Sequence, residues 1–266
     1  MTTLMVAKGT LKINNGEIEF IKFGNGKRRL VVLPGLSYDG FFEQADAIAN
    51  AYSVFTQEFT VYLIDRNLTP HAGYTVKDIA RDSAEALKLL DINKADVFGA
   101  SLGGMVAQQL AISYPHIVNK LVLGSTLSRP NETFLSTLSR WEKSAISGEI
   151  DRLIRDINNT IYSSFTLKKY AKIFAAIKVV PTPEKTARFI TYLNSAKNFD
   201  IYCSLDNIKS ETLVIGALKD KITTAAAARE TANALNSKYF EYKRFGHAVF
   251  DEAKGYKTRI YGFLSK

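Results

Sequence analysis

Short, largely apolar runs alternate along much of the chain with stretches in which apolar residues recur every three or four positions. The runs are rich in β-branched residues, and they comprise Leu30–Leu33, Val61–Ile64, Ala95–Phe98, Leu121–Leu123 and Leu213–Ile215. Such runs predict strands that are buried on both faces of a sheet. Their alternation with helical patterns indicates a mainly parallel sheet that is flanked by helices.

Capping and turn residues predict the boundaries of several elements. Thr75, with Asp78 three residues later, is typical of a capping box and predicts the start of a helix. A second helix is predicted from Leu102 to Tyr114, because Pro115 follows it. Near the N-terminus, the turn sequence Asn-Asn-Gly predicts a hairpin between two runs, Gly9–Ile13 and Glu17–Phe23.

The alternation stops in the middle of the chain. Between residues 128 and 209 large apolar residues recur at helical spacing, as in Phe134, Leu138 and Trp141, and no strand is predicted. The strand and helix pattern returns at Leu213. We therefore expect an α/β core formed by residues 1–127 and 210–266, with a helical insertion over residues 128–209.

Composition excludes several classes of protein. Apolar residues make up 46% and charged residues 23% of the 266 positions, which is typical of a globular chain and not of a disordered one. The net charge of +9 comes from scattered basic residues, so we expect a solvated basic surface and no nucleic-acid partner. No apolar run is long enough for a membrane helix, and the first residues do not resemble a signal peptide.

The cysteine content adds a further constraint. A single cysteine, Cys203, excludes an internal disulfide framework and a zinc site built from cysteines, and we expect its side chain to be buried. These features favour a cytoplasmic protein without a metal ion. We expect a monomer or homodimer whose partner is a small-molecule substrate.

The clearest chemical motif is the sequence Gly99-Ala100-Ser101-Leu102-Gly103, which lies between a predicted strand and a predicted helix. Gly99 and Gly103 lack side chains, so the chain can turn sharply around Ser101. Such a turn presents the serine hydroxyl at the carboxyl edge of the sheet, where the helix N-terminus favours developing negative charge. The motif predicts that Ser101 is a nucleophile. The alternative is a glycine turn that only packs the helix closely against the strand.

A nucleophilic serine needs a base, and the base needs an orienting acid. Of the three histidines, His247 follows the last predicted strand and would therefore reach the same sheet edge, whereas His71 and His116 are predicted to be solvated. Asp220 follows the run that ends at residue 215, again at a carboxyl end. The predicted catalytic order along the chain is Ser101, Asp220 and His247.

This order of nucleophile, acid and base is that of the α/β-hydrolase superfamily, which the chain resembles over essentially its full length. The resemblance implies an eight-stranded, mostly parallel sheet, with the helical insertion forming a cap over the active site. It also implies an oxyanion hole made of backbone N–H groups, which we place at Leu36 and Leu102. The superfamily often has His-Gly after its third strand, where this chain has Pro34-Gly35. The replaced histidine changes little, because the donor is a backbone group.

These residues predict a serine hydrolase that cleaves a small or medium apolar carboxylic ester or thioester through an acyl-enzyme. Neither a metal nor an organic cofactor is needed for this chemistry. Aromatic residues are frequent in the cap, and most of them are expected to pack its helices onto the core. For the substrate pocket we expect contributions from Ser37, Trp141, Phe174 and Tyr192.

Two other functions are compatible with the same residues. Within the superfamily, the same triad also serves carbon–carbon bond hydrolases and lyases that act on anionic dicarbonyl substrates, and Arg129 or Arg140 could bind such an anion. Other members are ligand-binding receptors with slow or absent catalysis. Turnover distinguishes an enzyme from a receptor, and the preferred substrate distinguishes the two kinds of enzyme.

Overall fold

The computed structural model describes residues 4–176 and 179–266, and in this part of the chain eight strands form one sheet. The strand order is β1-β2-β4-β3-β5-β6-β7-β8, in which β2 is antiparallel to both of its neighbours and the remaining pairs are parallel. The strands are β1 (Val6–Ile13), β2 (Gly16–Phe23), β3 (Arg28–Leu33), β4 (Phe59–Asn67), β5 (Ala95–Ala100), β6 (Val118–Gly124), β7 (Glu211–Ala217) and β8 (Lys238–Tyr242). The predicted mostly parallel sheet is confirmed, and each predicted apolar run lies within one of these strands.

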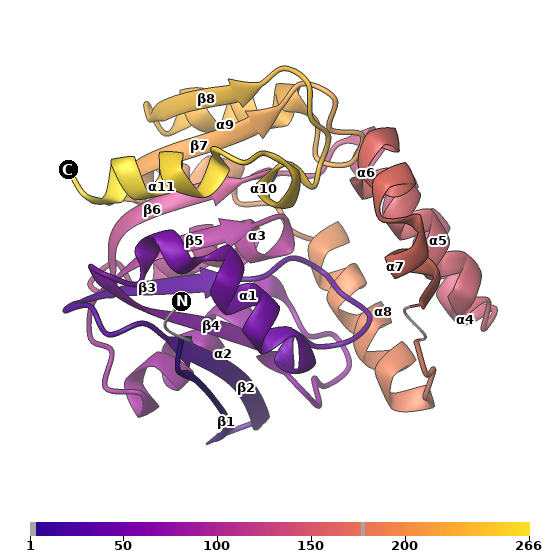
Figure 1. The fold of residues 1–266 in the computed structure, drawn as a ribbon, viewed down its shortest axis with the longest axis horizontal. Coiled ribbons are helices and arrows are strands. Elements are labelled where there is room, and N and C mark those ends of the chain that lie inside the picture. The colour runs from indigo at the N-terminus through magenta and orange to yellow at the C-terminus, as the bar shows by residue number, and fades with distance from the viewer. Residues whose placement is uncertain (1–3, 177–178) are drawn as a thin grey trace.

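Helices cover both faces of the sheet (Figure 1). One face carries α1 (Ala45–Ala51), α10 (Val249–Glu252) and α11 (Tyr256–Leu264), and the other carries α2 (Val76–Leu89), α3 (Leu102–Ser113) and α9 (Ala225–Ala234). Short 3-10 helices lie in the connecting segments, namely η1 (Phe42–Gln44), η2 (Ser53–Phe55) and η3 (Tyr202–Asn207). The capping box of α2 is present as predicted, with Thr75 and Asp78 bonded reciprocally.

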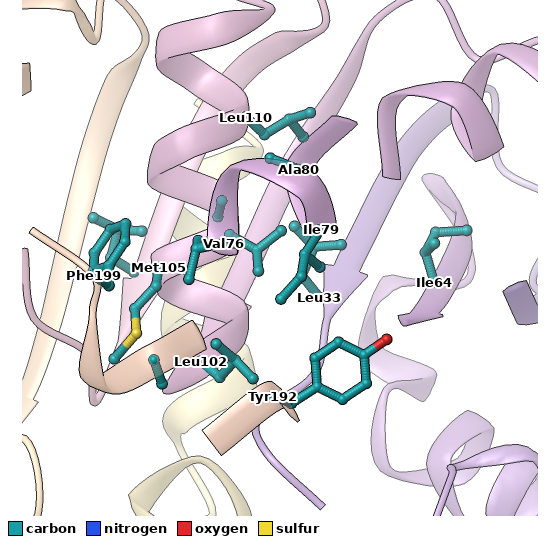
Figure 2. Packing of buried hydrophobic residues seen from close by; sticks show 14 of the residues in the cluster. Leu33, Ile64, Val76, Ile79, Ala80, Leu102, Met105, Leu110, Tyr192 and Phe199 are labelled. Atoms are coloured by element: carbon teal, nitrogen blue, oxygen red, sulfur yellow. The ribbon is translucent and has the colours of Figure 1, made fainter. Parts of the chain in front are cut away.

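The core has one apolar cluster on each side of the sheet. All nine residues of β4 are buried, as expected for a strand that is covered on both faces. Figure 2 shows Leu102, Met105 and Leu110 along α3 within the larger cluster, together with Leu33 from β3 and Tyr192 from the cap. Cap and core therefore share one hydrophobic cluster.

The described residues of the insertion between β6 and β7 form helices joined by loops, without a strand. It consists of α4 (Glu132–Ile146), α5 (Ile150–Ile161), α6 (Ser164–Lys169), α7 (Ala171–Ala176) and α8 (Pro183–Lys197), followed by η3. Side chains cap three of these helices at their N-termini, because Asn131, Ser163 and Thr182 each accept a hydrogen bond from a backbone N–H in the first turn. The cap helices gather at the edge where the parallel strands end (Figure 1).

One expectation about the surface is wrong. Cys203 was expected to be buried, but its side chain is exposed on η3. The short 3-10 helix buries Leu205 instead, so the apolar contact of this segment with the core comes from the residue two positions later. In the described ranges, no helix is both long enough and apolar enough to cross a bilayer.

Helix α3 approaches the sheet so closely that it requires glycine at its first turn. A Cβ atom added to Gly103 would lie 1.9 Å from the carbonyl oxygen of Leu33, and one added to Gly99 would lie 2.2 Å from the carbonyl oxygen of Gly103. Both obstacles are backbone atoms that cannot move without shifting a strand or the helix. The two glycines therefore allow the contact between β3, β5 and the start of α3.

We predict opposite effects for Gly→Ala substitutions at two helical positions. Gly103→Ala should lower the free energy of unfolding by about 3 kcal/mol or more, because of overpacking against β3. Gly262→Ala should raise it by about 0.5–1 kcal/mol, because Gly262 lies in α11 with nothing within 4 Å of its added Cβ. Urea unfolding of both variants measures these values. Equal effects at the two positions would contradict the close approach of α3.

Candidate active site

Ser101 occupies a sharp turn between β5 and α3. Its backbone has φ 55° and ψ −121°, a conformation that side-chain-bearing residues rarely adopt. Hydrogen bonds to one neighbouring segment hold this turn. The N–H of Ser101 donates to the carbonyl of Gly124 at 2.9 Å, and the hydroxyl of Thr126 donates to the carbonyl of Ser101 at 2.8 Å. The end of β6 thus stabilises the strained turn at the end of β5.

The structure brings together the three residues that the sequence predicted as a triad. His247 Nε2 lies 3.0 Å from Ser101 Oγ, and His247 Nδ1 lies 3.0 Å from Asp220 Oδ2. Ser101 follows β5, Asp220 follows β7 and His247 follows β8, so the carboxyl ends of three parallel strands in one sheet supply all three. Asp220 and His247 are buried, whereas Ser101 is partly exposed.

Asp220 is held by donors on several sides. Its Oδ1 accepts hydrogen bonds from the N–H groups of Ile222 at 2.8 Å and Thr223 at 3.1 Å, and its Oδ2 accepts one from the Thr223 hydroxyl at 2.7 Å. Burial alone would raise the pKa of this carboxyl, but the charge of protonated His247 and these donors outweigh it and lower the pKa below its usual value. Asp220 is therefore a carboxylate that can accept a hydrogen bond from the Nδ1–H group of His247.

The partners of His247 determine which of its two ring nitrogens carries a proton. A carboxylate has no proton to give, so the contact with Asp220 places the proton on Nδ1 and leaves Nε2 free to accept a hydrogen bond from the Ser101 hydroxyl. Phe250 packs edge-on against the imidazole at 6.3 Å between ring centroids. The arrangement can remove a proton from Ser101 and stabilise the imidazolium that results.

The loop after β3 lies against the serine. A Cβ added to Gly35 would be 3.3 Å from Ser101 Cβ, and Gly35 and Leu36 both line the cavity that contains the Ser101 hydroxyl. Leu102 is the first residue of α3, where backbone N–H groups have no acceptor within the helix. The N–H groups of Leu36 and Leu102 thus remain the predicted oxyanion donors, and both residues adjoin the nucleophile.

A small cavity of about 70 Å³ opens at the Ser101 and His247 side chains. Its lining is otherwise almost wholly apolar and comes from both core and cap: Gly35, Leu36, Leu102, Met105, Phe134, Leu138, Trp141, Ile157, Ile161, Ala196, Ile222 and Phe250. Lysine and arginine do not occur among these described lining residues. The chemistry of the cavity suits an uncharged, apolar group.

Of the four residues predicted to form the substrate pocket, only Trp141 lines this cavity. Phe174 lies in a separate hollow on the cap, which is lined by residues of α5, α6 and α7. Ser37 and Tyr192 line a polar cavity of about 10 Å³ behind the oxyanion loop. The hydroxyl of Tyr192 donates to the carbonyl of Asn67 at the end of β4, and Tyr192 does not line the cavity at Ser101.

Several lining residues could have been found from the helical spacing that identified Trp141. Phe134 and Leu138 precede it by seven and three positions and so share its face of α4. Ile157 and Ile161 form the corresponding face of α5. In contrast, no pattern in the sequence indicates that Ala196, Ile222 or Phe250 reaches the cavity, because each follows from how separate segments pack together.

The two arginines that could have bound an anionic substrate have other partners. Arg129 forms an ion pair with Glu230 and lies over the ring of Tyr202 at 4.2 Å, while Arg140 pairs with Asp156 at 2.7 Å. Both guanidiniums are at the protein surface and neither lines the cavity at Ser101. Over the described ranges, no cluster of three or more His, Cys, Asp or Glu side chains is arranged to hold a metal ion.

The loop that carries His247 is attached directly to the cap. The N–H of Ala248 donates to the carbonyl of Ile161, the last residue of α5, at 3.0 Å. Glu252, in α10, accepts hydrogen bonds from the backbone N–H of Ser163 at 3.0 Å and from its hydroxyl at 2.6 Å. These bonds join the α5–α6 junction to the segment that follows the proposed base.

The chain belongs to the α/β-hydrolase fold family, whose pattern matches residues 29–254. It is 27% identical over 190 residues to a putative non-heme bromoperoxidase BpoC of Mycobacterium tuberculosis, which covers 68% of this chain and 71% of the relative. Its fold is similar to that of the enol-lactonase from Burkholderia xenovorans LB400, with a TM-score of 0.83, 19% identity and coverage of 97% and 100% of the two chains. A thermophilic esterase from Thermogutta terrifontis superposes with a TM-score of 0.76 and 19% identity over 98% of each chain.

The backbone strain at Ser101 leads to a stability prediction. Ser101→Gly should be more stable than Ser101→Ala by about 1 kcal/mol, because glycine tolerates a positive φ that alanine does not, although it loses more entropy on folding. Both variants lack the hydroxyl, so the comparison isolates the backbone. At Ser136, an exposed residue within α4, the same pair of substitutions should favour alanine. Urea unfolding measures both differences, and an alanine preference at both positions would contradict strain at Ser101.

The lowered pKa of Asp220 leads to a pH prediction. A carboxyl whose pKa is lower in the folded than in the unfolded state, about 3.9 for aspartate, stabilises the fold above that value, and the contribution is lost as the pH falls through the folded pKa. The advantage in unfolding free energy of the wild type over Asp220→Asn should therefore narrow between about pH 5 and pH 3. Urea unfolding at several pH values tests this, with Ser101→Ala as a control whose difference stays constant. A gap that widens on acidification would refute the assigned direction.

Proposed function

We propose that this α/β hydrolase is a serine esterase that cleaves small, uncharged carboxylic esters with an apolar acyl group. The observation that carries the proposal is the hydrogen-bonded chain Asp220–His247–Ser101 ending in a small apolar cavity. A nucleophile, a base and an orienting acid within hydrogen-bond reach are the requirements for acyl transfer through serine. The apolar walls favour acyl groups that carry no charge.

In the first half of the reaction, the Ser101 hydroxyl attacks the ester carbonyl while His247 Nε2 takes its proton. Asp220 stabilises the imidazolium through Nδ1. Negative charge develops on the former carbonyl oxygen, which the N–H groups of Leu36 and Leu102 bind. One such donor is typically worth about 3 kcal/mol in the transition state. The tetrahedral intermediate then collapses, and His247 gives the proton to the departing alkoxide.

In the second half, a water molecule attacks the acyl group on Ser101. His247 again accepts a proton, now from the water, and returns it to the Ser101 oxygen as the carboxylic acid leaves. Each step moves one proton between the nucleophile or leaving group and Nε2. All atoms of this cycle come from the protein, the ester and water.

The cavity limits the size of the acyl group. Its volume of about 70 Å³ is small beside the 300–1,000 Å³ that is usual for drug-sized ligands. Trp141, Phe134 and Leu138 form its α4 wall, so the cap sets the depth available to an acyl chain. Among structures with the same fold, one is described as an enol-lactonase and another as an esterase, and both names denote cleavage of an ester bond. These names support the proposed bond type.

Hydrolysis of p-nitrophenyl acetate, butyrate and octanoate tests the proposal. We expect kcat/KM to be highest for the two short esters and at least about tenfold lower for octanoate, because each excluded methylene group forfeits burial or causes a clash. Ser101→Ala should lower kcat by about 10⁴-fold or more. A folded wild-type protein without turnover on any of the three esters would refute the proposal.

A cap variant tests whether this cavity sets the chain-length preference. Trp141→Ala should shift the ratio of kcat/KM for octanoate to that for acetate upward by about tenfold, because it removes part of the α4 wall. Phe174→Ala is the matched control, since this aromatic residue of the cap lines a different hollow. An equal shift in both variants would show that the acyl chain lies elsewhere in the cap.

A further inference from the structure

The loop that follows β3 is held by one buried arginine. Arg66, near the end of β4, directs Nη1 to the carbonyl oxygens of Pro34 at 3.1 Å and Gly35 at 2.6 Å. Its Nη2 donates to the hydroxyl of Ser37 at 3.1 Å. Three of the first four residues after β3, all except Leu36, are therefore bonded to a single guanidinium.

The contact with Gly35 constrains the group that matters for catalysis. The carbonyl of Gly35 and the N–H of Leu36 belong to the same peptide unit, which is planar and trans, so they point in opposite directions. When the guanidinium fixes the carbonyl, it also fixes the direction of the N–H. This loop lies against Ser101, with a Cβ added to Gly35 only 3.3 Å from Ser101 Cβ.

We propose that Arg66 is the positioning residue for the oxyanion donor Leu36. This inference rests on the proposed esterase function, because an oxyanion forms only if Ser101 attacks a carbonyl. Arg66 does not touch the substrate. It sets the orientation of the Gly35–Leu36 peptide before the substrate binds, and a preorganised donor of this kind acts mainly in the transition state.

Arg66 is itself firmly placed. Its side chain is only 7% exposed, and Nη2 forms an ion pair with Asp65 at 3.3 Å. The guanidinium also lies over the ring of Tyr192 at 5.2 Å and that of Phe41 at 5.9 Å. A planar guanidinium can bond several acceptors in fixed directions while its faces contact aromatic rings, which a lysine ammonium cannot do.

The cap holds the other end of the same loop. The hydroxyls of Tyr38 and Thr186, from α8, lie 2.7 Å apart, and Lys185 pairs with Asp39 at 2.8 Å. These contacts attach the loop to α8 but do not reach the Gly35–Leu36 peptide. The orientation of that peptide therefore depends on Arg66, while the cap fixes where the loop continues.

The experiment compares Arg66→Met, Arg66→Lys and Arg188→Met with the wild type on p-nitrophenyl butyrate. Active sites are counted with a fluorophosphonate that labels Ser101, so kcat refers only to folded, competent enzyme. Arg188 lines the same small polar cavity and, among the described hydrogen bonds, donates none to the loop, which makes it a matched control. We expect Arg66→Met to lower kcat per labelled site about 10–100-fold, with KM within about threefold of the wild type.

Arg66→Lys should recover part of kcat, because an ammonium can still bond one of the carbonyls, and Arg188→Met should retain the wild-type kcat. A purely structural role for Arg66 would lower the number of labelled sites and leave kcat per site unchanged, and that result would overturn the inference. A KM that rises by the same factor as kcat falls would also overturn the inference. A wild-type protein that neither hydrolyses the ester nor reacts with the fluorophosphonate would overturn the esterase proposal together with this one.

Discussion

The close approach of α3 to the sheet is the constraint on which the active site depends. Because Gly99 and Gly103 have no side chains, the chain can pass from β5 into α3 within a single residue, and that residue is Ser101. The unfavourable backbone of Ser101 is tolerated because Gly124, at the end of β6, and Thr126, just after it, bond to it. The strained backbone of Ser101 is thus a consequence of the packing. It leaves the side chain of Ser101 partly exposed at the sheet edge.

The other parts of the site follow from the parallel sheet. Carboxyl ends of parallel strands lie at one edge, so loops far apart in the chain bring Asp220 and His247 to Ser101 without long connections. Burial makes each polar group there dependent on its partners. Asp220 has donors from Ile222 and Thr223 in addition to His247, and Arg66 has carbonyl acceptors in addition to Asp65. The bonded members of such networks hold one another in a fixed geometry.

The sequence was sufficient to predict the site residues that are placed by the order of strands along the chain. It was not sufficient to predict the residues that are placed by packing between helices. The sequence could predict that Ser101, Asp220 and His247 lie close together, because each follows a recognisable strand. The carboxyl end of a parallel strand places a residue at a known edge of the sheet. Tyr192 and Phe174 were assigned to the pocket only as aromatic residues of the cap, although helical spacing cannot give the rotation of a cap helix over the core. Arg66 follows a predicted strand as well, but nothing in its neighbours indicates that it bonds to a distant loop.

The attachment of the cap to the loop after His247 has a consequence for how such an enzyme can change over evolution. The bonds from Ala248 to Ile161 and from Ser163 to Glu252 make the segment after the base part of the cap's own support. A cap helix that shifts to admit a bulkier molecule therefore pulls on the residues that hold the imidazole in place. We therefore expect the shape of the cap and the alignment of the proposed base to change together. New specificities are then most accessible through side chains on α4, which can change size while the α5–α6 junction keeps its place.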